Sequence, residues 1–171
     1  MALPCEDVVA VTSAHINHIS IGAKDLDESV RFYVEVFGAE VIDTPNFGLP
    51  VQWLSIGALQ LHISVRQTDP PTYNHFAMVV DDFESVYRTT RDWGGHDGET
   101  MGYLLGELPS GQVQLYIRDP AGNLVEVNAS DARTLSQEIQ RELFRLEDHQ
   151  PQDASNRKAA LFLPGGSRDR R

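Results

Sequence analysis

Two histidines and one glutamate recur at matched places in this sequence, and their side chains are those of a metal site. Asn17-His18 returns as Asn74-His75 at an offset of 57 residues. Gln60 and Glu126 are matched at an offset of 66. Two imidazoles, one carboxylate and one amide oxygen suit a divalent first-row metal. We therefore predict one bound divalent ion (Fe, Mn, Ni, Co or Zn), with His18, His75, Glu126 and Gln60 as ligands.

A further histidine, His62, leaves the fourth ligand open. It follows Gln60 by two residues, so the two side chains share one face of an extended strand. His62 is an alternative ligand to Gln60, or a general base or substrate contact beside it. Glu126 and His62 are the two candidates for moving a proton. His15 and His96 lie off the matched positions, and we expect them at the surface, while His149 lies near the tail.

Strand alternation extends the predicted site to neighbouring side chains. By parity we expect Leu54 and four polar or charged residues to face the same side as the ligands, and these four are the predicted substrate contacts: Gln52, Gln114, Tyr116 and Arg118. Arg118 is a candidate for holding an anionic substrate.

The elements that must position these residues form an internal repeat. In the first module, residues 14–66, we predict a strand over 15–21 and a helix that begins at Asp25 and stops at Gly38. Asp25 with Glu28 resembles a capping box, and glycine favours the left-handed end of a helix. Strands are expected over 39–43, 51–56 and 59–65.

The second module, residues 73–130, repeats this order. We predict a strand over 74–80, a helix over 82–93, one short strand within 96–106, and paired strands over 112–118 and 123–129. The turn sequence Asp119-Pro120-Ala121-Gly122 joins the last pair. The predicted fold class is α+β, with two tandem βαβββ modules forming a curved mixed sheet cup in one domain of residues 14–130.

The segments outside the repeat are predicted to be simpler. Residues 1–13 are expected to be an irregular N-terminal extension. Residues 131–149 have an apolar stripe of leucine and isoleucine and predict one amphipathic C-terminal helix. Residues 150–171 are polar and are expected to be mostly a loose tail.

Charge and composition narrow the class of partner. The formal net charge of −11 argues against binding a nucleic-acid backbone, which requires clustered lysine and arginine. No stretch reaches the length of apolar residues that a membrane span needs. The single cysteine, Cys5, and the absence of a signal-peptide pattern fit a cytoplasmic protein. We expect a small-molecule substrate.

The paired pattern resembles a known family. INHISIGAKDLDESVRFYVEVFGAEV, YNHFAMVVDDFESVYRTTRDWGG and the closing QLYIRDPAGNLVEV are similar to the vicinal oxygen chelate superfamily, over about residues 14–130. That superfamily includes glyoxalase I, epimerases, fosfomycin resistance transferases, extradiol dioxygenases and bleomycin resistance proteins. In the resemblance, His18 and His75 match the strand histidines and Glu126 the metal-binding glutamate. The implied chemistry is electrophilic catalysis on a substrate whose adjacent oxygens chelate the metal.

The resemblance leaves the activity open. We favour a glyoxalase-like metal-dependent lyase, isomerase or epimerase acting on a small oxygenated substrate. One alternative is an Fe(II) extradiol-type dioxygenase, although such enzymes typically duplicate the whole domain. The other is a non-catalytic binding protein of the bleomycin-resistance kind, which generally lacks the ligand set. Relatives of this length are commonly homodimers, so one cup is formed either within one chain or across two.

Overall fold

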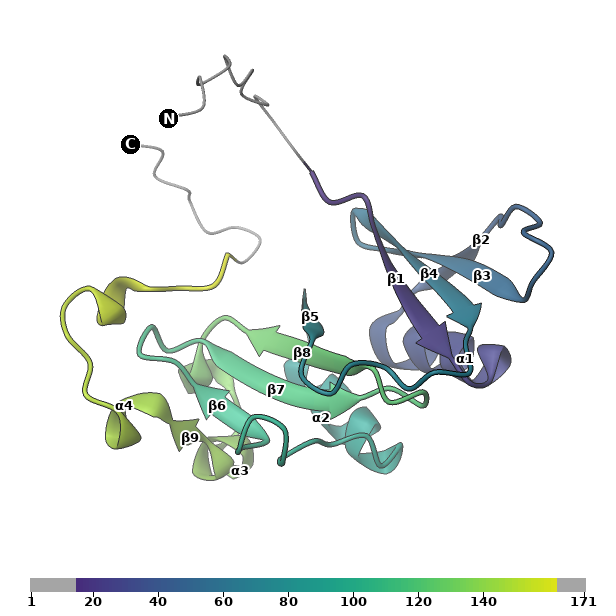
Figure 1. Ribbon diagram of the computed structural model, residues 1–171. Helices are drawn as coiled ribbons and strands as arrows, with labels where there is room; N and C mark the ends of the chain where they lie inside the picture. The colour runs from purple at the N-terminus through teal and green to yellow at the C-terminus, as the bar shows by residue number, and fades with distance from the viewer. Residues whose placement is uncertain (1–14, 163–171) are drawn as a thin grey trace, which may run out of the picture.

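The two predicted modules form two separate β-sheets. A computed structural model describes residues 15–162, so the predicted N-terminal extension and the end of the predicted tail lie outside the described residues. One sheet has the strand order β1-β4-β3-β2 and the other β5-β8-β7-β6-β9. Figure 1 shows the two sheets, in which β1 and β5 are edge strands. Residues of β1 and β5 both line one groove.

The first module follows the predicted order closely. It consists of β1 (His18–Ala23), α1 (Leu26–Phe37), β2 (Glu40–Ile42), β3 (Val51–Ile56) and β4 (Leu59–Val65). The side chain of Asp25 accepts a hydrogen bond from the Glu28 backbone N–H, which caps the helix as expected. Gly38 ends the helix with a φ of 63°, where a side chain would be strained.

The second module repeats this pattern. Its elements are β5 (His75–Val79), α2 (Phe83–Asp92), β6 (Leu105–Glu107), β7 (Val113–Arg118) and β8 (Leu124–Ala129). Asp82 caps α2 as Asp25 caps α1. In both modules the first strand pairs in parallel with the last. The α+β fold with tandem βαβββ modules is therefore confirmed.

The prediction of one helix over 131–149 was wrong. This region holds the short helix η1 (Ala132–Thr134), α3 (Gln137–Glu142), the two-residue strand β9 (Phe144–Arg145) and α4 (Leu146–His149), and η2 (Asn156–Lys158) follows. Leu135, Ile139 and Leu143 are buried as the apolar stripe predicted. The chain leaves the helix at Leu143 because β9 pairs with β6 and extends the sheet.

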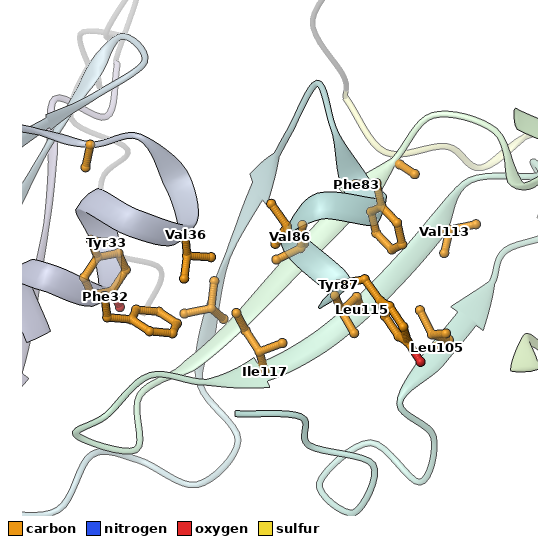
Figure 2. Close-up of a cluster of buried hydrophobic side chains, with 14 of the residues drawn as sticks. Phe32, Tyr33, Val36, Phe83, Val86, Tyr87, Leu105, Val113, Leu115 and Ile117 are labelled. Carbon is orange, nitrogen blue, oxygen red and sulfur yellow. The ribbon is translucent and has the colours of Figure 1, made fainter. Parts of the chain in front are cut away.

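The helices pack on one face of the sheets, and both modules contribute to one core. Figure 2 shows Phe32 and Val36 of α1 in the same cluster as Ile117 of β7. The rings of Phe32 and Trp93 meet edge to face at 5.4 Å. We call the opposite sheet face, which carries His18, His62, His75 and Glu126, the inner face.

Buried polar contacts also join the modules. The Tyr33 hydroxyl donates to Asp119 Oδ2 at 2.9 Å, and Asn123 Nδ2 donates to the Gly22 carbonyl at 2.8 Å. Burial raises the pKa of the Asp119 carboxyl, although hydrogen bonds from Asn123 and Tyr33 oppose this shift. The turn predicted at 119–122 therefore also fastens one module to the other.

Replacing Tyr33 by phenylalanine is expected to destabilise this junction. Tyr33→Phe keeps the ring but removes one donor from a buried carboxyl, which costs about 1–3 kcal/mol of unfolding free energy. Chemical denaturation followed by circular dichroism measures it. Tyr73→Phe is the control, because the Tyr73 side chain is exposed. Equal stability of both variants and the parent would contradict the assigned role of the junction.

No helix within residues 15–162 is long and apolar enough to cross a membrane.

Candidate metal centre in two halves

The predicted ligands lie in two pairs, one on each module. His18 and His62 lie together on the first sheet, and His75 and Glu126 lie together on the second. Among residues 15–162, no three His, Cys, Asp or Glu side chains of one chain gather closely enough to hold a metal ion. We call the two pairs the first and second half-sites.

The second half-site is built around Glu126. His75 Nε2 lies 3.1 Å from Glu126 Oε2, and Glu126 is buried in the middle of β8. Gln114 Nε2 and Asn128 Nδ2 both donate to the other carboxylate oxygen, Oε1, at 2.9 and 2.7 Å. Because Oε1 is held by two amides, Oε2 is the oxygen that faces His75.

Tyr116 completes the surroundings of the carboxylate. Its ring meets that of His75 edge to face at 5.8 Å and that of Tyr103 at 5.8 Å. Burial, followed by the negative charge of Glu126, raises the pKa of the Tyr116 phenol far above its ordinary value. Tyr116 therefore keeps its hydroxyl proton at physiological pH.

The first half-site is a stack of three rings. The His62 ring lies between Trp53, at 4.1 Å and 6°, and His18, at 4.4 Å and 14°. His62 Nε2 lies 3.0 Å from Gln60 Oε1. Partial burial and then the neighbouring His18 lower the pKa of His62, so the neutral imidazole, which is the form that binds metals, is favoured.

Hydrogen bonds to the histidines leave ring nitrogens with free lone pairs. His18 Nδ1 lies 2.6 Å from Asn17 Oδ1, and His75 Nδ1 lies 3.2 Å from the Tyr73 carbonyl. Carbonyl oxygens only accept, so Nδ1 carries the proton and Nε2 carries the lone pair in each neutral ring. A hydrogen bond from Nδ1 to such an acceptor is typical of histidines that bind a metal through Nε2.

At His75 the same hydrogen bond has a further consequence. The Nε2 lone pair and the Glu126 Oε2 lone pairs face each other across 3.1 Å. Two acceptors this close repel unless a proton or a cation lies between them. Two ligands about 2.1 Å from one ion at right angles are separated by about 3 Å, so the pair fits a metal such as Zn or Mn.

Strand pairing corrects the register of the repeat. Trp53 and Ser20 flank His62 on its neighbouring strands, as Tyr116 and Ala77 flank Glu126. His62 is therefore the structural equivalent of Glu126, at an offset of 64. Gln60 instead corresponds to Leu124. The expected match of Gln60 with Glu126 was wrong by two residues, which keeps the face but moves the position along the strand.

A sequence comparison now places the chain in a family. Residues 15–127 match the model of the Glyoxalase/Bleomycin resistance protein/Dioxygenase superfamily. The chain belongs to this superfamily. The match ends just after Glu126 and leaves out η1, α3, β9 and α4.

Individual members of the superfamily are similar over part of their length. The chain is 29% identical over 84 residues to a metallothiol transferase FosB from Lysinibacillus sphaericus, covering 45% of this chain and 57% of that protein. It is 27% identical over 122 residues to a putative lactoylglutathione lyase from Brassica oleracea var. gemmifera, covering 64% and 42%. The chain thus spans about half the length of these curated relatives.

Solved structures of the superfamily share the fold. A lactoylglutathione lyase from Agrobacterium tumefaciens superposes with a TM-score of 0.53 at 24% identity, covering 69% of this chain and 95% of that one. A fosfomycin resistance protein, FosX, from Listeria monocytogenes, in complex with Mn(II) and sulfate, gives 0.55 at 19% identity, covering 76% and 99%.

One predicted substrate contact, Gln52, and the residue Leu54 lie on the opposite face of β3 from the one predicted. Gln52 is one residue from Trp53 and lies on the opposite face, where its amide donates to the carbonyl of Ile42 and to Thr44 Oγ1. Leu54 is fully buried on that face. The expected parity of β3 was wrong because Trp53, and not Gln52, is the equivalent of a residue on the inner face of β7, and a shift of one residue along a strand reverses every side chain.

Arg118 is on the predicted face but is engaged by the protein. Its guanidinium donates to Asp97 Oδ2 at 2.7 Å, to Thr100 Oγ1 at 2.7 Å, and to the carbonyls of Gly122 and Thr72 at 2.9 and 2.6 Å. These four bonds hold the loop after α2 against the end of β7. Arg118 is therefore occupied as a structural group and is not presented to an anion.

The inner face also holds residues that the sequence reasoning missed. Asn128 and Trp53 contact a half-site directly, Tyr103 contacts the second half-site through one neighbour, and Phe144 stacks on Tyr103. Asn128 was recoverable, since it follows Glu126 by two residues on one strand. Phe144 was hidden because its segment reads as a helix.

Proposed function

We propose that this superfamily member is a glyoxalase-like metal-dependent enzyme of the lyase, isomerase or epimerase type. Its ion would be held by His18, His62, His75 and Glu126, and a small substrate would chelate the ion through adjacent oxygens. The facing lone pairs of His75 Nε2 and Glu126 Oε2 are the observation that carries this proposal. The neutral imidazole form favoured at His62 supports it.

The complete site is proposed to form between two chains. The half-sites of one chain do not meet among the described residues, and each holds two ligands. A symmetric homodimer would bring the first half-site of one protomer to the second half-site of its partner, twice.

Gln60 has a supporting place in this proposal. Its Oε1 accepts from the His62 Nε2–H, which fixes the ring and leaves Nδ1 with the lone pair. Asn17 and the Tyr73 carbonyl orient His18 and His75 in the same way. Each histidine is thus oriented by its own acceptor before any ion binds.

When bound, a divalent ion would supply a Lewis acid that polarises a substrate carbonyl and stabilises an enediolate or oxyanion. The chain's own groups would then orient the substrate and move its proton. Glu126 and His62 remain the two proposed proton carriers. Tyr116 and Gln114 lie on the inner face beside Glu126 and would donate to, or accept from, a substrate oxygen.

Four protein ligands disfavour the dioxygenase alternative. With His18, His62, His75 and Glu126 as ligands, a six-coordinate ion would have two positions left, enough for the two chelating oxygens of a substrate. An extradiol enzyme needs a further position for dioxygen, as in sites with two histidines and one carboxylate. The isomerase or lyase class therefore fits the proposed donor set better.

Metal analysis of protein purified without chelators tests the proposal. We expect about one divalent ion per chain in the parent and a large loss in both His18→Ala and Glu126→Ala. The identity of the ion and its response to added bidentate oxygen ligands would then define the chemistry. Negligible metal in all three proteins, together with failure to take up added Co²⁺ or Mn²⁺, would leave a non-catalytic binding protein.

A further inference from the structure

The segment beyond the superfamily match reaches the second half-site. β9 pairs in parallel with β6, with Gly106 opposite Phe144. Gly106 also lies opposite Gln114, which lies opposite Asn128. Cross-strand partners share a face, so Phe144 lies on the inner face, in the same row as the two amides that hold Glu126.

From Phe144, one ring contact and two hydrogen bonds lead to the carboxylate. The Phe144 ring stacks on Tyr103 at 4.9 Å and 4°, and it also stacks with His149 at 4.1 Å and 6°. The Tyr103 hydroxyl donates to Gln114 Oε1 at 3.4 Å. Gln114 Nε2 in turn donates to Glu126 Oε1 at 2.9 Å.

Gly106 makes room for this arrangement. A Cβ atom at this position would lie 2.4 Å from Tyr103 Cε2, which is far inside contact distance. The Tyr103 ring therefore lies directly over the β6 backbone and is closed in by Phe144 on the side of β9. Without Phe144, Tyr103 would lose the surface that fixes its ring angle and, with it, the direction of its hydroxyl.

We propose that Phe144 is a positioning residue for the candidate metal centre. Through the Tyr103 hydroxyl, it orients the Gln114 amide that donates to Glu126 and so fixes the carboxylate that would bind the ion. This inference rests on the proposed metal-dependent function and assigns to the C-terminal segment a role at the site. Groups that orient a metal ligand commonly change metal affinity by 10–100-fold when they are removed.

The test measures the dissociation constant of Co²⁺ for the full chain, by competition with a chromophoric chelator. Phe144→Ala is expected to raise this constant about tenfold. Phe144→Tyr keeps a stacking ring and is expected to restore the parent value. Arg145→Ala is the matched control, because its side chain leaves β9 on the opposite face and contacts Glu107.

A double-mutant cycle separates positioning from general loosening. If Phe144 acts through the Tyr103 hydroxyl, adding Phe144→Ala to Tyr103→Phe is expected to cause no further loss of Co²⁺ affinity. Additive losses, or an equal loss in Arg145→Ala, would overturn the proposal. So would unchanged affinity in Phe144→Ala, provided that its melting temperature shows a folded protein.

The Co²⁺ titrations of the parent and of Phe144→Ala also test the role of Phe144 separately from the proposed metal-dependent function. A parent protein that binds no Co²⁺ would overturn both, because no affinity would remain to be tuned. A parent that binds Co²⁺ and a Phe144→Ala variant that binds it equally well would overturn only the role of Phe144.

Discussion

His62→Ala is expected to weaken metal binding more than a hundredfold, whereas Gln60→Ala is expected to weaken it by about tenfold or less. The first change removes a ligand from the ion, while the second removes only the acceptor that orients the His62 ring. His62 occupies the place that Glu126 occupies in the other module, and Gln60 does not.

Titration of the metal-free proteins with Co²⁺ or Mn²⁺ measures both dissociation constants. Leu59→Ala serves as a control on the same strand, since its side chain has the opposite parity to His62 and Gln60. The reverse order, with the greater loss in Gln60→Ala, would make Gln60 the ligand and His62 its neighbour.

Two metal-free variants are expected to regain metal binding when they are mixed. In a dimer that shares its sites, a His18→Ala chain and a Glu126→Ala chain together form one site with all four ligands and one site that lacks two. Random exchange of subunits would therefore restore about a quarter of the sites. The effect is large because each variant alone is expected to bind almost no metal.

The mixing experiment is read out as bound Co²⁺ after the two proteins are unfolded together and refolded. Each variant refolded alone is the control for partial recovery. A site built within one chain would predict no recovery at all, since every chain would lack a ligand. That result, with metal still bound by the parent, would reject the shared dimeric site and keep the metal-dependent function.

Repetition made most of the fold predictable from the sequence. Asp25 and Asp82 cap equivalent helices, and His18 and His75 begin equivalent strands, at the same offset of 57. His75 followed from this register, whereas Glu126 was predicted from a match with Gln60 that was two residues off and from the resemblance to the superfamily. When the same helix cap and strand pattern occur in both modules, each copy supports the assignment of the other, and the local sequence signals agree with the overall fold.

The remaining errors arose where contacts distant in sequence decide the structure. The lengths of the hairpins determine which residues of β3 and β4 correspond to those of β7 and β8. Because the predicted correspondence of β3 was one residue off, Gln52 was expected on the inner face but lies on the face that packs against the helices. Arg118 is occupied by Asp97, Thr100, Thr72 and Gly122, which no spacing rule connects to it. Phe144 lies in β9 and not in the predicted helix, because this segment pairs with β6. The helical spacing of apolar residues does not reveal that the edge of a sheet offers hydrogen bonds to the same segment.

The ring stack of the first half-site includes an intrinsic fluorophore, because one of its three rings is an indole. The sequence contains two tryptophans, and one of them, Trp53, lies parallel to His62 at 4.1 Å. The other, Trp93, packs against Phe32 and Arg31 near the helices. An indole in face contact with an imidazole changes its emission when that imidazole gains a charge, so tryptophan fluorescence reports on His62 without any attached dye.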